Sequence, residues 1–143
     1  MVETIHSLML KENNRIEQFI DKFEKQLDNY EKTLANFNKL KWNVQKHFFV
    51  EENAIFRMFA TIKSSETADL FHLLSDHSKI IHLLKKIEEK LNQKIKPETK
   101  LFKEIFIQHR KFEDEIFYPK LDEELDVNQK KEIAVKIKQV ILA

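Results

Sequence analysis

The chain contains no glycine and only two prolines in 143 residues. Glycine supplies the positive φ angles of many tight turns and proline interrupts helices, so a chain that nearly lacks both has little to stop helix formation. Lysine, glutamate and leucine favour helices and are abundant here. We therefore expect an all-α fold. The glycine-rich phosphate-binding loops of P-loop and Rossmann proteins are excluded, because both need glycine.

Apolar residues recur at helical spacing along most of the chain. They predict five helices, at approximately residues 4–30, 37–64, 65–95, 97–119 and 126–141. Four long helices that are joined by short turns must run antiparallel to their neighbours. The predicted fold is an up-down-up-down antiparallel four-helix bundle with a short C-terminal fifth helix, and residues 1–143 are expected to form a single domain.

Capping residues and prolines predict where these helices begin and end. The first turn is expected within residues 28–36. Ser65 is the expected N-cap of the third helix, since acidic residues follow it in the first turn. Pro97 fits the first turn of the fourth helix, where a missing N–H costs nothing. Pro119 should kink or end that helix.

A short phrase occurs twice, with His47 four residues before Glu51 and His109 four residues before Glu113. An acidic residue follows each glutamate, and an Ile-Phe pair follows within five residues. Residues four apart lie on the same face of an α-helix, so each imidazole and carboxylate can reach one metal centre. Hydrogen bonds on the helix are the alternative explanation, which the duplication disfavours.

A third histidine is expected at the same level of the bundle. His47 precedes the turn at residues 64–65 by about 17 residues and His77 follows it by about 12, so antiparallel packing brings them to similar heights. His77 and His109 are placed similarly about the turn at residues 96–97. Since the chain has no cysteine, nitrogen and oxygen atoms must hold any metal. A pair of iron or manganese ions suits such ligands.

With these motifs the chain resembles the hemerythrin-like (HHE) cation-binding domains over essentially its whole length. The similar segments are residues 10–17, 47–52, 75–80 and 109–119. The resemblance implies a non-heme diiron centre in which histidines ligate the ions and two glutamates bridge them, with manganese or zinc as substitutes for iron. The implied metal ligands are His47, Glu51, His77, His109 and Glu113.

Asn13 departs from the family's pattern, which has a histidine at this position of the first helix. An amide oxygen is a weaker, neutral ligand, so the second ion is expected to be loosely held, absent or capped by water. The pair of third-helix histidines four apart that classical oxygen carriers use is also missing. Whether Asn13, His6, His72 or His82 supplies a ligand stays open, although His82 is expected in the core and His72 off the metal-binding face.

Three functions remain after these observations. The resemblance implies first a metal-binding protein that binds or senses O2 or NO. The alternative is a diiron enzyme that acts on peroxide or NO or in iron-centre repair, although the absence of cysteine weakens the repair version. The third is a degenerate, metal-poor bundle that acts as an interaction module because Asn13 replaces the histidine.

Charge is nearly balanced, with 25 Lys and Arg residues against 24 Asp and Glu residues. The two signs are interspersed along the chain, so nothing attracts a polyanion and no nucleic-acid partner is expected. No stretch has the apolar length of a membrane span, and the N-terminus lacks the apolar run of a secretory signal. We expect a cytoplasmic protein without a membrane partner.

Overall fold

The computed structural model describes residues 4–62 and 67–142, and these residues are helical almost throughout. The elements in chain order are α1 (Ile5–Lys25), α2 (Tyr30–Val50), η1 (Glu51–Phe56), α3 (Arg57–Ile62), α4 (Thr67–Asn92), α5 (Lys100–Phe112), η3 (Glu113–Phe117), α6 (Tyr118–Glu124) and α7 (Val127–Leu142). The η segments are short π-helices, each lying between two α-helices without a break. The predicted all-α fold is confirmed.

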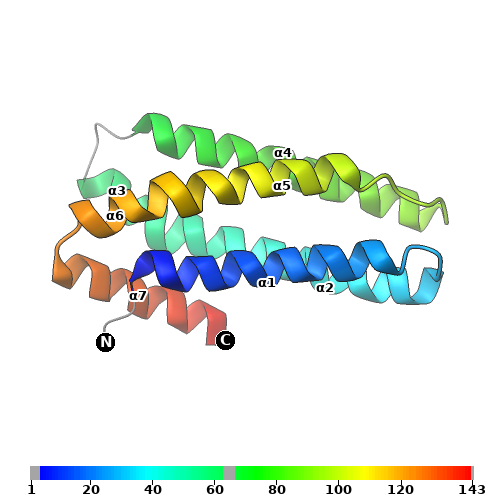
Figure 1. Ribbon diagram of the computed structural model, residues 1–143, viewed down its shortest axis with the longest axis horizontal. Helices are drawn as coiled ribbons and strands as arrows, with labels where there is room; N and C mark the ends of the chain where they lie inside the picture. The colour runs from blue at the N-terminus through cyan, green and yellow to red at the C-terminus, as the bar shows by residue number, and fades with distance from the viewer. Residues whose placement is uncertain (1–3, 63–66, 143) are drawn as a thin grey trace.

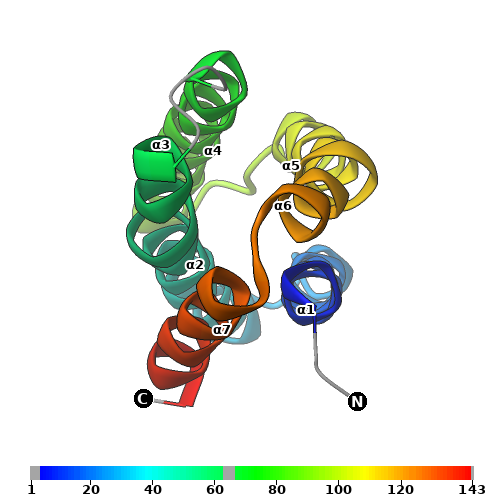
Figure 2. The same cartoon turned by 90° about the vertical axis from the view of Figure 1, so that its left-hand side faces the viewer.

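Four long helical rods lie side by side and form the body of the molecule (Figure 1). The rods are α1, α2 with η1 and α3, α4, and α5 with η3 and α6. Seen from one end, they surround a common interior, and α7 packs outside them against α1 and α2 (Figure 2). The structure is therefore the expected helical bundle with a C-terminal helix.

The first turn lies earlier than the sequence predicted. It occupies residues 26–29, because α1 ends at Lys25 and α2 begins at Tyr30. The side chain of Asn29 caps α2 by accepting a hydrogen bond from the amide of Lys32 at 3.1 Å. An asparagine in this position satisfies an amide that the helix itself leaves unpaired, so the helix can begin directly after it. The predicted turn and N-cap at residues 64–65 lie outside the described residues.

The prediction for Pro97 is wrong, because α5 begins only at Lys100. The preceding helix ends at Asn92, and Lys94 adopts a positive φ of 57°. The amide of Ile95 then donates to the carbonyl of Lys90 at 2.8 Å, which is the bond that closes a Schellman motif. A lysine therefore performs the turn that glycine performs in most proteins, and Pro97 falls in the connection.

Helical structure also continues through Pro119, so this residue does not end the rod. It lies in the first turn of α6, where a missing N–H is tolerated. The preceding π-helix has already changed the bonding pattern, since the amide of Tyr118 donates to the carbonyl of Glu113 five residues back. The fourth rod therefore runs from Lys100 to Glu124.

Two apolar clusters fill the interior on either side of a polar layer. One cluster joins α7 to the ends of the rods near α3 and α6, and it includes Met9, Phe59 and Leu121. The other lies toward the opposite end and includes Phe23 and Phe102. Burial of such side chains is the main stabilising contribution to a bundle. The polar layer between the clusters is thus held by apolar packing on both sides.

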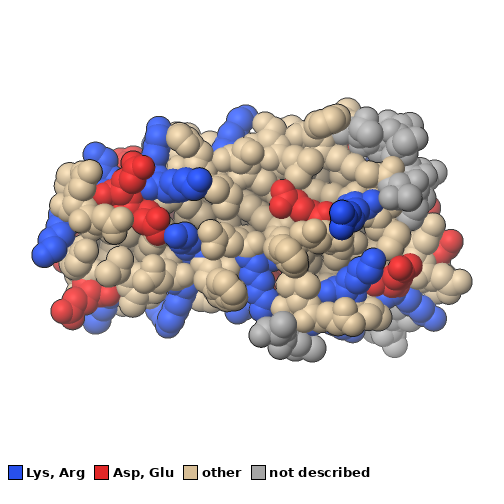
Figure 3. Space-filling view, turned by 180° about the vertical axis from the view of Figure 1, so that it is seen from behind, with Lys and Arg blue, Asp and Glu red and all other residues tan. Residues whose placement is uncertain are grey.

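The outer surface mixes charges of both signs. Basic and acidic side chains are interspersed over the face shown in Figure 3. Among the described residues, no helix combines the length and apolar character that crossing a bilayer requires.

Candidate metal centre

The structure brings the five predicted metal-ligating residues together in the polar layer of the bundle. His47 comes from α2, His77 from α4 and His109 from α5, while Glu51 and Glu113 begin the two π-helices. None of the five is more than 3% exposed. Four of them, Glu51, His77, His109 and Glu113, each place a nitrogen or oxygen atom within 4.8 Å of the others'. His77 and His109 thus lie at one level of the bundle, as expected from their distances to the turn, and metal binding by the five residues stays a prediction.

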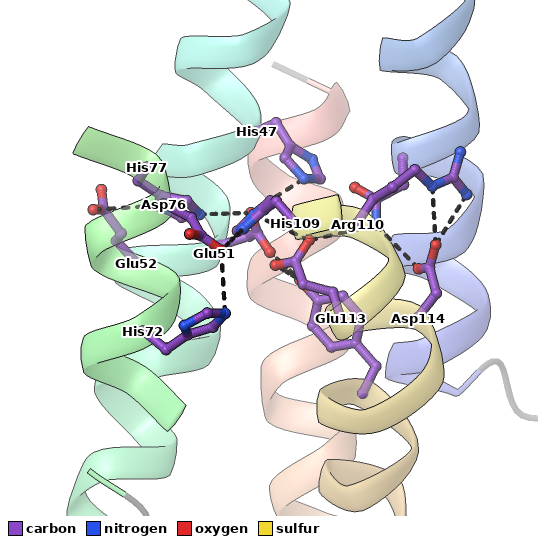
Figure 4. A network of polar contacts seen from close by, with 12 residues as sticks. His47, Glu51, Glu52, His72, Asp76, His77, His109, Arg110, Glu113 and Asp114 are labelled. Atoms are coloured by element: carbon purple, nitrogen blue, oxygen red, sulfur yellow. Dashed lines mark hydrogen bonds and ion pairs between the residues drawn. The ribbon is translucent and has the colours of Figure 1, made fainter. Parts of the chain in front are cut away.

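Three imidazoles meet at one carboxylate oxygen. Oε1 of Glu51 lies 3.1 Å from Nε2 of His47, 3.2 Å from Nε2 of His77 and 3.9 Å from Nε2 of His109 (Figure 4). Nε2 of His109 also lies 3.4 Å from Oε1 of Glu113. One oxygen cannot satisfy three imidazoles well, so the arrangement is not explained by ordinary ion pairs.

The same atoms lack hydrogen bonds although they are buried. Oε1 of Glu51, both ring nitrogens of His47 and of His77, and Nε2 of His109 have no hydrogen-bond partner. Each buried polar atom without a partner costs about 1–3 kcal/mol, and native proteins contain few of them. A cation bound among these lone pairs would satisfy most of them at once. The donor set therefore fits a metal ion.

Both glutamates occupy the first position of a π-helix, at Glu51–Phe56 and Glu113–Phe117. Short π-helices are rare and frequently occur at functional sites. A π-helical turn draws the residue five positions after the glutamate closer to the glutamate's side of the helix than an α-helical turn would. That residue is Phe56 in the first repeat and Tyr118 in the second, and the ring of Phe56 stacks at 5.6 Å on that of His77.

Asp76 fixes the orientation of one imidazole from outside the centre. Its Oδ2 atom lies 3.1 Å from Nδ1 of His109 and 3.5 Å from Nε2 of His72. Burial raises the pKa of Asp76, but the hydrogen bond and charge of His109 outweigh this effect and leave the pKa below its usual range. When the carboxylate accepts a hydrogen bond from Nδ1–H of the imidazole, the Nε2 lone pair is available to a metal.

The carboxylates and imidazoles of the centre shift one another's pKa values. Burial raises the pKa of Glu51, yet the neighbouring imidazoles, His47 first, hold it well below its usual range. Burial lowers the pKa of His77, but Glu51 and Glu52 raise it to about 9. Without a metal, the centre thus balances buried carboxylate charge with protonated imidazole. A bound cation would take over that role.

Asn13 of α1 lies at the edge of the centre and is completely buried. Its Nδ2 donates to Oδ1 of Asp114 at 3.0 Å and lies 3.5 Å from Oε1 of Glu113. Arg110 holds Asp114 in place through two contacts of 3.0 Å and reaches Asn14 at 2.7 Å. Since two carboxylates face the amide nitrogen, the amide oxygen cannot take its place. This oxygen is buried without a hydrogen-bond partner.

The other histidines lie apart from the convergence point. His82 is exposed, so its predicted place in the core is wrong: it lies on the outer face of α4, in a surface groove of about 490 Å³ that His77 also lines. His72 contacts Asp76 from a position that leaves 55% of its side chain exposed, as expected for a residue off the metal-binding face. His6 is half-buried near the start of α1.

Sequence reasoning did not find Tyr118, which is completely buried and hydrogen-bonded to both glutamates. Its distance of five residues from Glu113 puts it on a different face of a regular α-helix, so only a foreseen π-helix would have revealed it. The sequence analysis did not single out Asp76 either. Its position directly before His77 and four residues after His72 could have marked it as a partner for a histidine.

Comparison with known proteins agrees with this geometry. The family model of the hemerythrin HHE cation-binding domain matches residues 4–121. This range contains the whole polar layer and leaves out α7. No curated protein and no solved structure gives a significant match.

Proposed function

Because the chain belongs to the family of hemerythrin HHE cation-binding domains, we propose that its buried centre binds two non-heme iron ions and that the protein binds or senses O2 or NO. One observation carries the proposal. Three imidazole nitrogens approach a single buried carboxylate oxygen, and neither they nor that oxygen has a hydrogen-bond partner. Buried imidazole nitrogens and a carboxylate oxygen that lack hydrogen-bond partners can serve as ligands for a cation, which takes the place of any imidazole proton when it binds.

The proposed ligands are the five residues that the sequence pointed to. His47, His77 and His109 would hold iron through their Nε2 atoms, which already face Glu51. Glu51 and Glu113 would bridge the two ions, since each carboxylate offers two oxygens. Imidazole and carboxylate ligands together suit iron, and manganese or zinc accept the same atoms.

Aromatic side chains pack around the centre. The ring of Phe48 stacks on that of His77 with 3.8 Å between centroids, and Phe56 stacks on the same imidazole. Phe117 packs edge-on against Phe56 at 5.5 Å. Iron held by these residues would supply the chemistry that binds a diatomic ligand. The aromatic residues limit water around it and favour small apolar molecules such as O2 and NO.

Two further functions stay open as alternatives. The same centre could act as an enzyme on peroxide or NO, or in iron-centre repair. A metal-poor interaction module is the third alternative, but it does not explain why buried atoms of His47, His77 and Glu51 have no hydrogen-bond partner. A centre that had lost its metal for good would be expected to lose such costly groups as well.

Gas binding to the iron-loaded protein tests the proposal. The metal-free protein is loaded with Fe(II) under anaerobic conditions, and absorption and electron paramagnetic resonance spectra are recorded before and after NO or O2 is added. We expect a spectral change with one or both gases. His77→Ala should abolish it, whereas His82→Ala, which removes an exposed histidine of the same helix, should not. Iron-loaded protein that responds to neither gas would contradict the proposal, and catalytic turnover of peroxide or NO would favour the enzyme.

A further inference from the structure

We propose that Tyr118 is an additional oxygen ligand and that the metal centre has a nitrogen-rich half and an oxygen-rich half. This inference rests on the iron binding proposed above and adds a residue to it. Tyr118 is completely buried. Its hydroxyl donates to Oε2 of Glu113 at 3.0 Å and forms a short contact with Oε2 of Glu51. The hydroxyl therefore touches both proposed bridging carboxylates.

The two oxygens of Glu51 face different surroundings. Its Oε1 atom is the one that the three Nε2 atoms approach, while its Oε2 atom meets Tyr118. Glu113 repeats the division, since Oε1 faces His109 and Oε2 faces Tyr118. Nitrogen donors thus gather on the Oε1 side of the carboxylates, and the phenol completes a set of three oxygens on the Oε2 side.

The π-helix places Tyr118 in this position. In a regular α-helix, a residue five positions after Glu113 would point about 140° away from it. Here the amide of Tyr118 donates to the carbonyl of Glu113, which closes one π-helical turn, and the Tyr118 hydroxyl lies within hydrogen-bond distance of the Glu113 carboxylate. The equivalent residue of the first repeat is Phe56, which has no hydroxyl. Packing alone therefore does not require a phenol at this position.

The chemistry of the oxygen-rich half suits ferric iron. Carboxylates are ligands for hard cations, and tyrosine is an established iron ligand in proteins. The hydroxyl of Tyr118 is hydrogen-bonded to both carboxylates. A cation held by these three oxygens would take the place of those hydrogen bonds, and the phenolic proton would leave to solvent.

Spectroscopy of the iron-loaded, air-oxidised protein tests the inference, because tyrosine bound to ferric iron gives a charge-transfer band in the visible region. The chain has only two tyrosines, and Tyr30 lies elsewhere, with its hydroxyl on the carbonyl of Leu91. Tyr30→Phe therefore leaves Tyr118 as the only tyrosine. Absorption and resonance Raman spectra are recorded for the wild type, Tyr30→Phe and Tyr118→Phe, together with iron per chain and helix content.

We expect a visible band in the wild type and in Tyr30→Phe, and complete loss of it in Tyr118→Phe. Ring-deuterated tyrosine incorporated into Tyr30→Phe should shift the Raman modes, and this measurement stands even if Tyr118→Phe does not fold. Protein that binds iron without a tyrosine-derived band overturns the role of Tyr118 and leaves the proposed function intact. Wild-type protein that binds no iron overturns both.

Discussion

Nδ1 of His109 lies 3.1 Å from Oδ2 of Asp76, so a carboxylate outside the centre holds an imidazole inside it. Loss of such a partner typically weakens metal binding by about 10–100-fold. We expect Asp76→Ala to weaken iron binding within this range, measured by competition with a chelator. Asp76→Asn should recover part of the loss, because its amide oxygen can still accept the Nδ1 proton.

His72 provides the matched control for Asp76. It contacts the same carboxylate at 3.5 Å, but 55% of its side chain is exposed. Exposed ion pairs contribute little, so His72→Ala should leave iron binding nearly unchanged. If Asp76→Ala bound iron as tightly as the wild type, the orientation of His109 would not depend on this carboxylate.

Replacing Asn13 with histidine should strengthen metal binding. Its side chain is buried with the amide nitrogen 3.5 Å from Glu113 and the amide oxygen without a partner, and an imidazole is a stronger ligand than an amide. We expect Asn13→His to raise iron per chain or to slow iron loss to a chelator. Asn53→His adds a histidine at an exposed position and should change neither quantity. An unchanged rate in Asn13→His would mean that another group already fills this position.

If Glu51 and Glu113 both bridge the two ions, iron binding should depend equally on each of them. Glu51→Ala and Glu113→Ala each remove a completely buried carboxylate, and we expect each to abolish binding of both ions. Metal analysis of the purified variants measures this directly. Glu115→Ala removes an exposed carboxylate from the same π-helix and should keep the full complement. Loss of only one ion in either buried variant would refute bridging by that residue.

Removal of iron should weaken the fold without destroying it. The two apolar clusters lie on both sides of the centre and consist of residues other than the proposed metal ligands. A ligand that binds only the folded state adds about 2.7 kcal/mol of stability at 100 times its Kd. We expect the chelated protein to remain helical by circular dichroism and to melt at a lower temperature than the iron-loaded protein. Complete unfolding on chelation would show that the apolar clusters are insufficient.

The sequence predicted the fold and the five central residues because both depend on regular geometry. Missing glycine and helical periodicity were sufficient for the bundle, and spacing of four placed His47 with Glu51 and His109 with Glu113. Antiparallel packing then brought His77 to the same level. Each of these steps uses only the constant pitch and rise of an α-helix.

The remaining features were hidden because they depart from that regular geometry. Tyr118 reaches Glu113 only through a π-helical turn, which no residue pattern announced. Lys94 adopts a left-handed conformation that glycine normally marks, and Pro97 consequently lies before the helix it was expected to begin. Asn13 appeared as a missing ligand, and only the structure shows that Asp114 holds its amide nitrogen and leaves the oxygen unpaired.

Metal analysis of the purified protein tests the central claim most directly. The protein is stripped of metal, reconstituted with Fe(II), freed of excess iron by gel filtration and analysed for iron and protein concentration. We expect two iron ions per chain in the wild type, and none in a variant that lacks both Glu51 and Glu113. Wild-type protein that is fully helical yet retains no iron would contradict the proposed diiron centre.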